Sequence, residues 1–155
     1  MPDLDCQSIM RRTTTSLYED DPVSTAIDFM VERHMGLVPV VDRDEVYVGE
    51  ISGDRLMHAM LPQMLRVVRG IKRASYLRES LEDMEERLHA LGRQPIGSLI
   101  DRHVPVVHPD TPLIDAILLL SQNHNVVPVV DPESGKLLGA ISFFTVLKAL
   151  EEARS

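Results

Sequence analysis

Two serines, Ser52 and Ser142, occupy matching places in the chain, each directly before a stretch with the character of a helix. A serine in that place caps a helix by accepting a hydrogen bond from a backbone N–H group. The N–H groups that remain free favour a phosphate or a carboxylate, as does the positive end of the helix dipole. Arg55, three residues after Ser52, carries a guanidinium that binds the same groups, whereas Thr145 holds the matching place after Ser142. These residues predict one anion site near Ser52 and a second, weaker one near Ser142.

The other reactive residue types are not arranged for catalysis or metal binding. Nucleophilic catalysis requires a serine or cysteine activated by a base, next to a group that stabilises developing charge. Ser52 and Ser142 are better explained as helix caps, and no His, Cys or acidic residues show the ligand spacing of zinc. His34 and His124 recur at matching places, where we expect each to end a helix. We therefore expect a protein that is not an enzyme and binds no metal.

The matching places belong to a unit that occurs twice. Residues 37–42 read LVPVVD and residues 126–131 read VVPVVD, and each run is followed by a glycine and then Ile-Ser. Because overlooking a repeat misassigns the whole fold, this duplication is the primary signal. The two copies share identical residues at an offset of 90 (89 within the VPVVD run), including Pro22 and Pro112, Ala26 and Ala116, His34 and His124, Gly49 and Gly139, and Ile51 and Ile141.

Each copy is predicted to contain a helix, two strands and a second helix, preceded by a short extended segment. Proline near the start of the first helix is favourable, because its missing N–H is harmless in the first turn. Apolar residues at three- and four-residue spacing indicate helices, and the valine runs indicate strands. The stretches are DDPVSTAIDFMVERH and DTPLIDAILLLSQNH for the first helices, VPVV, VYVGEI and LLGAI for the strands, GDRLMHAML and FFTVLKAL for the second helices, and TTTSLY and VPVVH for the extended segments.

Residues 61–97 have no counterpart in the duplication. Apolar residues there alternate spacings of four and three, which predicts an amphipathic helix with one apolar seam, and Gly92 with Gln94-Pro95 would end it. The seam is too short for an independent coiled coil, so we expect it to pack on the body of the protein or on a second subunit. The predicted divisions are 7–60, 61–97 and 98–153, and the seam residues are Leu77, Leu81, Met84, Leu88 and Leu91.

Composition and charge exclude several classes of function. The formal net charge of −8 argues against nonspecific binding to nucleic acid, which requires a basic surface. No apolar run approaches the ~20 residues of a membrane-spanning helix, and the single Cys6 is typical of a reducing compartment, so we expect a cytoplasmic protein. Five basic residues between Arg66 and Arg78 precede the first acidic one. They form either a docking site for an acidic partner or phosphates, or a solvated surface.

The duplicated pattern, h-P-V-V-D followed by G-h-I-S before a helix, resembles a pair of CBS domains (cystathionine-beta-synthase domains), also called a Bateman module. The resemblance implies an α/β (α+β) fold with a three-stranded sheet and two helices in each copy. The copies would pack about a pseudo-twofold axis and leave two clefts. It also implies adenosine-containing ligands such as AMP, ADP, ATP or S-adenosylmethionine, a homodimer, and a regulated partner protein.

Backbone groups beside the two strand prolines could hydrogen-bond the edge of a base, and apolar side chains offer a slot for its ring. The lead-in segments would form the entrance strands, and the helix starts would hold an anionic group. The candidate ligand-binding residues are therefore Thr14, Thr15, Val38, Pro39, Val40, Ser52, Asp54, Arg55, Val106, His108, Val127, Pro128, Val129, Ser142 and Thr145.

One feature of nucleotide-binding members is absent from both copies. Such members usually carry an aspartate three residues after the serine or threonine, and its carboxylate accepts hydrogen bonds from both ribose hydroxyls. Arg55 and Thr145 hold these places, and Asp54 falls one residue early, which turns a helical side chain by roughly 100°. An arginine cannot accept from a diol, but it binds phosphate well.

Two hypotheses of function follow. In the first, the chain is a non-catalytic regulatory module that senses a small anionic ligand, an adenosine nucleotide or a related metabolite, and signals to a partner. In the second, it is a protein–protein adaptor or dimerisation module without a small-molecule ligand, and it acts through the inserted helix.

Overall fold

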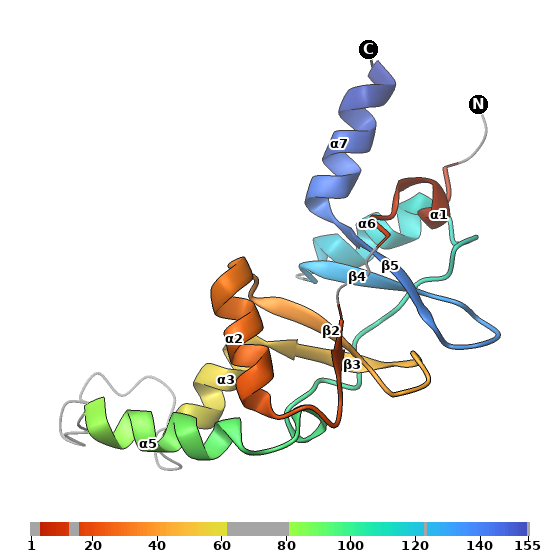
Figure 1. Ribbon diagram of the computed structural model, residues 1–155. Helices are drawn as coiled ribbons and strands as arrows, with labels where there is room; N and C mark the ends of the chain where they lie inside the picture. The colour runs from red at the N-terminus through yellow and green to blue at the C-terminus, as the bar shows by residue number, and fades with distance from the viewer. Residues whose placement is uncertain (1–3, 13–15, 62–80, 123, 155) are drawn as a thin grey trace.

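The computed structural model describes residues 4–12, 16–61, 81–122 and 124–154, which form two small α/β units joined by a helix (Figure 1). The predicted α/β class and the helix–strand–strand–helix order of each copy are confirmed. The described elements are α1 (Cys6–Ile9), β1 (Leu17–Tyr18), α2 (Val23–Arg33), β2 (Leu37–Val41), β3 (Tyr47–Ser52), α3 (Gly53–Met60), α5 (Leu81–Gly92), the 3-10 turn η2 (Ile96–Ser98), α6 (Leu113–Ser121), β4 (Val126–Val130), β5 (Leu137–Ser142) and α7 (Phe143–Arg154).

The first unit contains a three-stranded sheet in the order β1-β2-β3. Strand β1 runs parallel to β2, and β2 pairs antiparallel with β3. Because side chains alternate along a strand, Val38 and Val40 face the same side of β2, where both are completely buried. They form one core with residues of α2 and α3, namely Val23, Ala26 and Leu56.

The second unit has a similar core but a smaller sheet. Strands β4 and β5 pair antiparallel, and the lead-in segment adds one parallel bridge, between Val107 and Val129. In the first unit the Glu19 N–H donates to the Val41 carbonyl at 2.9 Å. The matching residue of the second unit is Pro109, which has no N–H to donate. The third strand predicted for the second copy is therefore reduced to a single bridge.

Each unit is completed by the segment that precedes the other unit in the sequence. Arg11 and Ala140 exchange backbone hydrogen bonds of 2.9 and 3.0 Å, and Cys6 is buried in the second core. At the matching place Asp101 and Glu50 exchange hydrogen bonds of 2.8 and 3.1 Å, which holds the segment after α5 on the first unit. These reciprocal contacts agree with the pseudo-twofold arrangement expected for a duplicated unit.

The exchange of segments explains the two glycines of the repeat. A Cβ atom at Gly49, whose φ is +154°, would collide with the Asp101 carbonyl oxygen. A Cβ atom at Gly139 would lie 2.7 Å from the Arg11 carbonyl oxygen. Only glycine allows the crossing backbone to approach each strand so closely.

The turns of the two hairpins form a further contact between the units. The Tyr47 N–H donates to the Gly135 carbonyl at 2.9 Å, and Val46 forms an antiparallel bridge with Lys136. The described units therefore meet through backbone pairing as well as through the exchanged segments.

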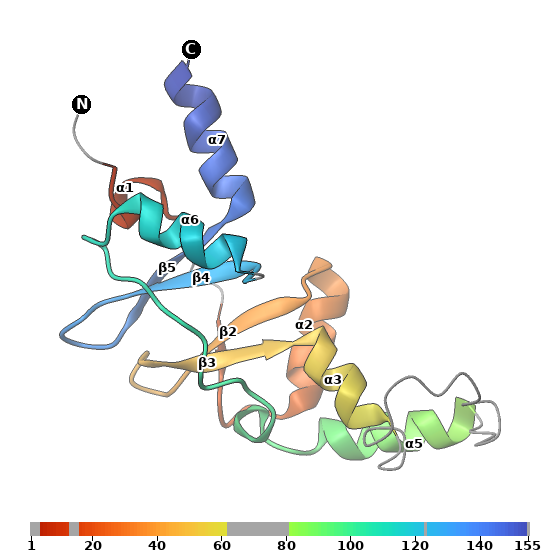
Figure 2. The same ribbon diagram turned by 180° about the vertical axis from the view of Figure 1, so that it is seen from behind.

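The predicted inserted helix is present as α5, and it packs on α2 and α3 of the first unit (Figure 2). Leu91 is buried in the first core, Leu88 is half-buried, and Met84 is 39% exposed. Arg87 Nη1 donates to the Met60 carbonyl at 3.0 Å. The expectation that the seam packs on the body is confirmed for the end of α5 near Gly92, whereas Leu77 and the basic residues from Arg66 to Arg78 lie outside the described residues.

The two matching histidines differ in their relation to the first helix of each unit. His34 ends α2 with φ +52°, in the left-handed conformation of a helix C-terminus. Helix α6 ends earlier, at Ser121, so His124 lies beyond it and the prediction for His124 was wrong. The Ser121 hydroxyl donates to the Leu118 carbonyl at 2.7 Å, and this local bond favours an earlier end of the helix.

Candidate functional site

Both predicted helix caps are present, but the two copies complete them differently. Ser52 Oγ accepts from the Arg55 N–H at 3.2 Å, and Ser142 Oγ accepts from the Thr145 N–H at 3.4 Å. In the second unit the Thr145 hydroxyl also accepts from the Ser142 N–H at 2.9 Å and donates to the Ser142 carbonyl at 2.8 Å. The Thr145 hydroxyl therefore forms a reciprocal cap with Ser142, whereas the Arg55 side chain points away from the start of α3.

The Arg55 guanidinium reaches the segment that crosses from α5 to the second unit. Its Nη1 donates to the Ile100 carbonyl at 3.4 Å, and its Nη2 lies 3.8 Å from Asp101 Oδ1. Both are long contacts, and 47% of the side chain remains exposed. A guanidinium has five N–H donors, and most of those of Arg55 form no hydrogen bond to a described residue. Arg55 thus joins the start of α3 to the backbone that links the two units.

A partly buried carboxyl lies in the same region. Burial and the negative charge of Asp101 raise the pKa of Glu50 to about 7, and the positive charge of Arg55 opposes this rise. The neighbouring Tyr47 hydroxyl is buried without a hydrogen-bond partner among the described residues, and burial raises its pKa. The place that matches Glu50 holds Ala140 in the second unit. The charged cluster belongs to the first unit alone.

The strand residues predicted to contact a ring mostly belong to the two cores. The side chains of Val38, Val40, Val127 and Val129 have no exposed surface, so they can contribute to a ligand site through their backbone only. Pro39 is half-buried and Pro128 is buried. The sequence pattern alone does not distinguish a valine that lines a cleft from a valine that fills the core.

The lead-in residues of the second unit lie beside β4. Val106 is half-buried next to the bridge between Val107 and Val129, and His108 Nδ1 lies 2.9 Å from the Val130 carbonyl. Because a carbonyl oxygen only accepts, this ring nitrogen must carry the proton. Thr14 and Thr15 of the first lead-in lie outside the described residues. Asp54 is exposed in the first turn of α3.

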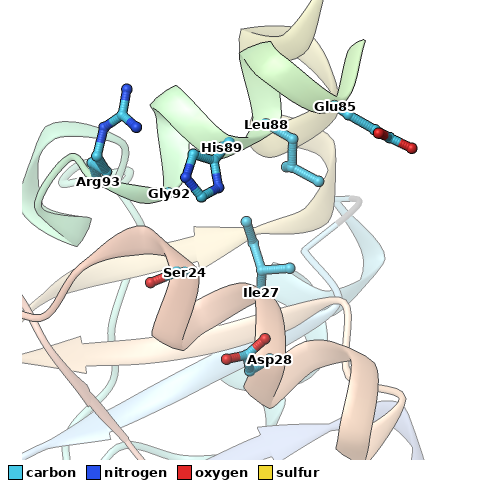
Figure 3. A pocket seen from close by; sticks show the side chains of 8 residues that line it. All are labelled: Ser24, Ile27, Asp28, Glu85, Leu88, His89, Gly92 and Arg93. Carbon is cyan, nitrogen blue, oxygen red and sulfur yellow. The ribbon is translucent and has the colours of Figure 1, made fainter. Parts of the chain in front are cut away.

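A surface hollow of about 300 Å³ lies elsewhere, between α2 and α5 (Figure 3). Ile27 and Leu88 face each other across it, and His89 points into the same space. None of the predicted ligand-binding residues that the structure describes lines this hollow. The apolar seam of α5 was a partial signal for it, but the position of α2 beneath that seam is a tertiary property. Its lining is completed by Ser24, Asp28, Glu85, Gly92 and Arg93.

Cys6, the only cysteine, is not placed for chemistry. It is fully buried in the second core, and burial with the nearby charges of Asp5 and Asp115 raises its thiol pKa to about 11. It therefore stays a protonated thiol at neutral pH. Separately, none of the helices in the described part of the chain is long and apolar enough to cross a membrane.

The fold is a tandem-repeat module of two α/β units. Each unit is completed by a segment that precedes the other, and in each a capped helix follows the second strand of the hairpin. The sequence profile of the CBS domain matches residues 6–62 and 96–152, which is most of the chain. The chain therefore belongs to the CBS domain family and carries two CBS domains in tandem, as the duplication predicted. CBS-pair proteins are generally regulatory modules without catalytic activity.

Known relatives extend over nearly the whole chain. An uncharacterized protein of Methanocaldococcus jannaschii, MJ1426, is 27% identical over 146 residues, covering 86% of this chain and 84% of its own length. The CBS-pair protein CBSX2 from Arabidopsis thaliana has a TM-score of 0.75 at 22% identity, with 99% of both chains covered.

Two of the similar structures contain nucleotides. CBSX2 in complex with AMP has a TM-score of 0.72 at 21% identity, covering 97% of this chain and 98% of that one. CbpB in complex with c-di-AMP has a TM-score of 0.70 at 14% identity, covering 96% and 85%. At these identities the likeness shows a common fold.

Proposed function

We propose that this chain is a non-catalytic regulatory module that binds a small anionic ligand, an adenosine nucleotide or a related metabolite, and signals to a partner protein. Support comes from the family and from relatives that bind AMP and c-di-AMP. The observation that carries the proposal is the position of Arg55. It lies in the first turn of α3, where free N–H groups favour an anion, and most of its own donors form no hydrogen bond to a described residue.

The same contacts supply a route for the signal. Arg55 holds Ile100 and Asp101 only through long contacts, so a phosphate at the start of α3 would compete with Asp101 for the guanidinium. The segment that contains Asp101 leads directly into the second unit. A ligand that binds more tightly with this contact open would shift the population towards that arrangement.

We propose that a nucleotide is recognised through its phosphate, because neither unit has the aspartate that would bind the ribose. Without a carboxylate at the places of Arg55 and Thr145, a ribose diol has no acceptor there. Recognition in the first unit would therefore depend on the phosphate, and ligands with more phosphate charge should bind better. Adenosine itself should bind weakly.

A panel of thermal melts tests the proposal. Purified chain, stripped of bound ligand, is heated with AMP, ADP, ATP, S-adenosylmethionine, adenosine or inorganic phosphate. A ligand at 100 times its dissociation constant stabilises the folded state by about 2.7 kcal/mol, which gives a measurable shift. Arg55→Ala should remove the shift. Arg43→Ala, which removes the same charge at the exposed β2–β3 turn, should keep it. A flat panel, or an equal shift in Arg55→Ala, would contradict the proposal.

The second candidate function, an adaptor that acts through the inserted helix, is favoured by the hollow between α2 and α5. Because Leu91 of α5 is part of the first core, deletion of the helix would also damage the fold. Replacement of the exposed Glu82, Glu85 and Glu86 by lysine tests the surface alone. A ligand sensor should keep its melting shift in this variant, whereas an adaptor should lose its partner.

A further inference from the structure

The hollow between α2 and α5 narrows towards one end and has an apolar floor. A Cβ atom at Gly92 would lie 3.4 Å from the Ser24 Cβ, so the two helices approach closely where both residues are small. One turn further along each helix, Ile27 and Leu88 face each other across the hollow, and both are half-buried (Figure 3). Apolar surface of the first unit therefore stays open to solvent between two of its own helices.

The surroundings of this floor are acidic. Asp28 and Glu85 line the hollow, and Glu85 also lines an adjoining hollow beside α5. Among the described residues that line the two hollows, Asp28, Glu82, Glu85 and Glu86 carry negative charge and Arg93 alone carries positive charge. None of the four carboxylates has an ion pair or a hydrogen bond within the described part of the chain. Glu82 lies three and four residues before Glu85 and Glu86, so these like charges repel each other on α5.

The combination of an apolar floor and unpaired negative charge excludes several kinds of occupant. A small-molecule site needs buried polar groups that orient the ligand, and no described polar or charged side chain is buried. The same face of a second copy would bring the same negative charge, and nucleic acid or an anionic membrane would be repelled in the same way. A polypeptide segment with basic side chains around an apolar one matches both features.

We propose that the hollow between α2 and α5 docks a basic segment of a partner protein. One apolar side chain of that segment would lie between Ile27 and Leu88, and its lysine or arginine side chains would pair with Asp28 and the carboxylates of α5. The volume of about 300 Å³ is at the lower end of ligand pockets, which suits a short segment. The proposal rests on the proposed function in one respect, that a partner protein exists, and it names the chemistry of that partner.

Fluorescence anisotropy with a synthetic probe tests the docking directly. The probe is a fluorescein-labelled peptide of lysine and alanine with leucines at helical spacing. The wild-type chain, stripped of bound ligand, should bind it at low salt with a dissociation constant on the order of 10–100 µM. Serine in place of leucine should weaken binding about fivefold or more, because the apolar anchor is lost. Salt at about 0.5 M should weaken binding to a similar degree, because it screens exposed charges.

A matched pair of triple variants locates the contact. Replacement of three α5 carboxylates by lysine should raise the dissociation constant about tenfold or more, whereas the same change of charge elsewhere should alter it about twofold at most. Asp28→Lys, on the facing helix, should raise it about threefold. Because all these side chains are exposed, the melting temperature of each variant should report an intact fold. The first variant carries Glu82→Lys, Glu85→Lys and Glu86→Lys, and the control carries Asp44→Lys, Glu133→Lys and Glu151→Lys.

Three results would overturn the proposal: a wild-type chain that does not bind the probe, equal binding of the serine peptide, or equal weakening in the two triple variants. If the wild type bound no probe and the α5 variant melted at a lower temperature, the chain's own basic residues between Arg66 and Arg78 would be the occupant instead. The nucleotide melting panel needs no peptide, so failure of the docking proposal is distinguishable from failure of the proposed ligand site.

Discussion

The two CBS domains of this chain share a fold and differ where matching places meet the surface. Three residues after the cap serine, the first unit has Arg55, which makes two long contacts with described residues. The second unit has Thr145, whose hydroxyl is hydrogen-bonded within its own helix cap. Above the helix pair, the first unit carries α5, whereas the second unit exposes apolar residues of α6 and α7 such as Leu118 and Leu147. The comparison indicates that duplication preserved the backbone contacts and released the surface side chains for separate roles. In the proposed function, the ligand site belongs to the first unit.

The largest expected effect is a loss of stability at the two glycines where a crossing segment approaches a strand, a feature that both units share. Gly49→Ala should destabilise the chain by about 3–4 kcal/mol, because the new Cβ collides with the Asp101 carbonyl and φ is +154°. Gly139→Ala should cost about 2 kcal/mol, because its Cβ would lie 2.7 Å from the Arg11 carbonyl without a strained φ. Urea unfolding measures both values.

The matched control for these variants is Gly36→Ala, since a Cβ there would meet nothing within 4 Å. Its unfolding free energy should stay within about 0.5 kcal/mol of the wild type. If Gly49→Ala and Gly139→Ala were as stable as this control, the exchanged segments could not be held on β3 and β5 as described.

Much of the fold was predictable, because each copy of the repeat contains residues that mark where its helices begin. Pro22 and Pro112 precede the first helices, and Ser52 and Ser142 cap the second ones, as their positions predicted. The exchange of the segments around Arg11 and Asp101, which precede the lead-in segments, was not predicted. When two copies are alike, the sequence does not state which copy a flanking segment packs on. The reduced third strand did have a signal, since Pro109 replaces a residue that must donate a hydrogen bond.

The candidate site was less predictable than the fold. The helix starts were identified because capping is local, within three residues of Ser52. The role of Val38 and Val40 depends on which side of β2 faces the core, and the contact from Arg55 to Asp101 joins residues far apart in the sequence. Such features depend on tertiary placement, which local patterns do not contain.

The next largest effect is a pH dependence of stability caused by Glu50, whose matching place in the second unit holds Ala140. The pKa of Glu50 is raised from 4.5 to about 7, so between these pH values the folded state holds a proton that the unfolded state has lost. The stability that this group contributes is complete below pH 4.5 and is lost as pH rises through about 7. Because the carboxyl is only partly buried, we expect a loss of about 1–2 kcal/mol. Glu50→Gln should remove this part of the pH dependence.

Urea unfolding at several pH values between 4.5 and 8 provides the measurement, on the order of the window over which a shifted carboxyl titrates. Glu133→Gln, at an exposed position in the turn of the second unit, is the matched control and should keep the wild-type slope. If Glu50→Gln also kept that slope, Glu50 would be ionised as an ordinary surface carboxylate, and the charged cluster would not distinguish the first unit.

The smallest effects separate the two helix starts themselves. Thr145→Val removes both hydroxyl bonds of the reciprocal cap and should cost about 1 kcal/mol in urea unfolding. Arg55→Ala removes contacts of only 3.4 and 3.8 Å at a half-exposed side chain, so it should change stability by a few tenths of a kcal/mol. In nucleotide binding we expect the reverse order, with a loss for Arg55→Ala and little change for Thr145→Val. If both variants lost the same stability and the same nucleotide affinity, the two helix starts would have the same role. Opposite orders of effect are expected only if Thr145 stabilises the helix start and Arg55 binds the ligand.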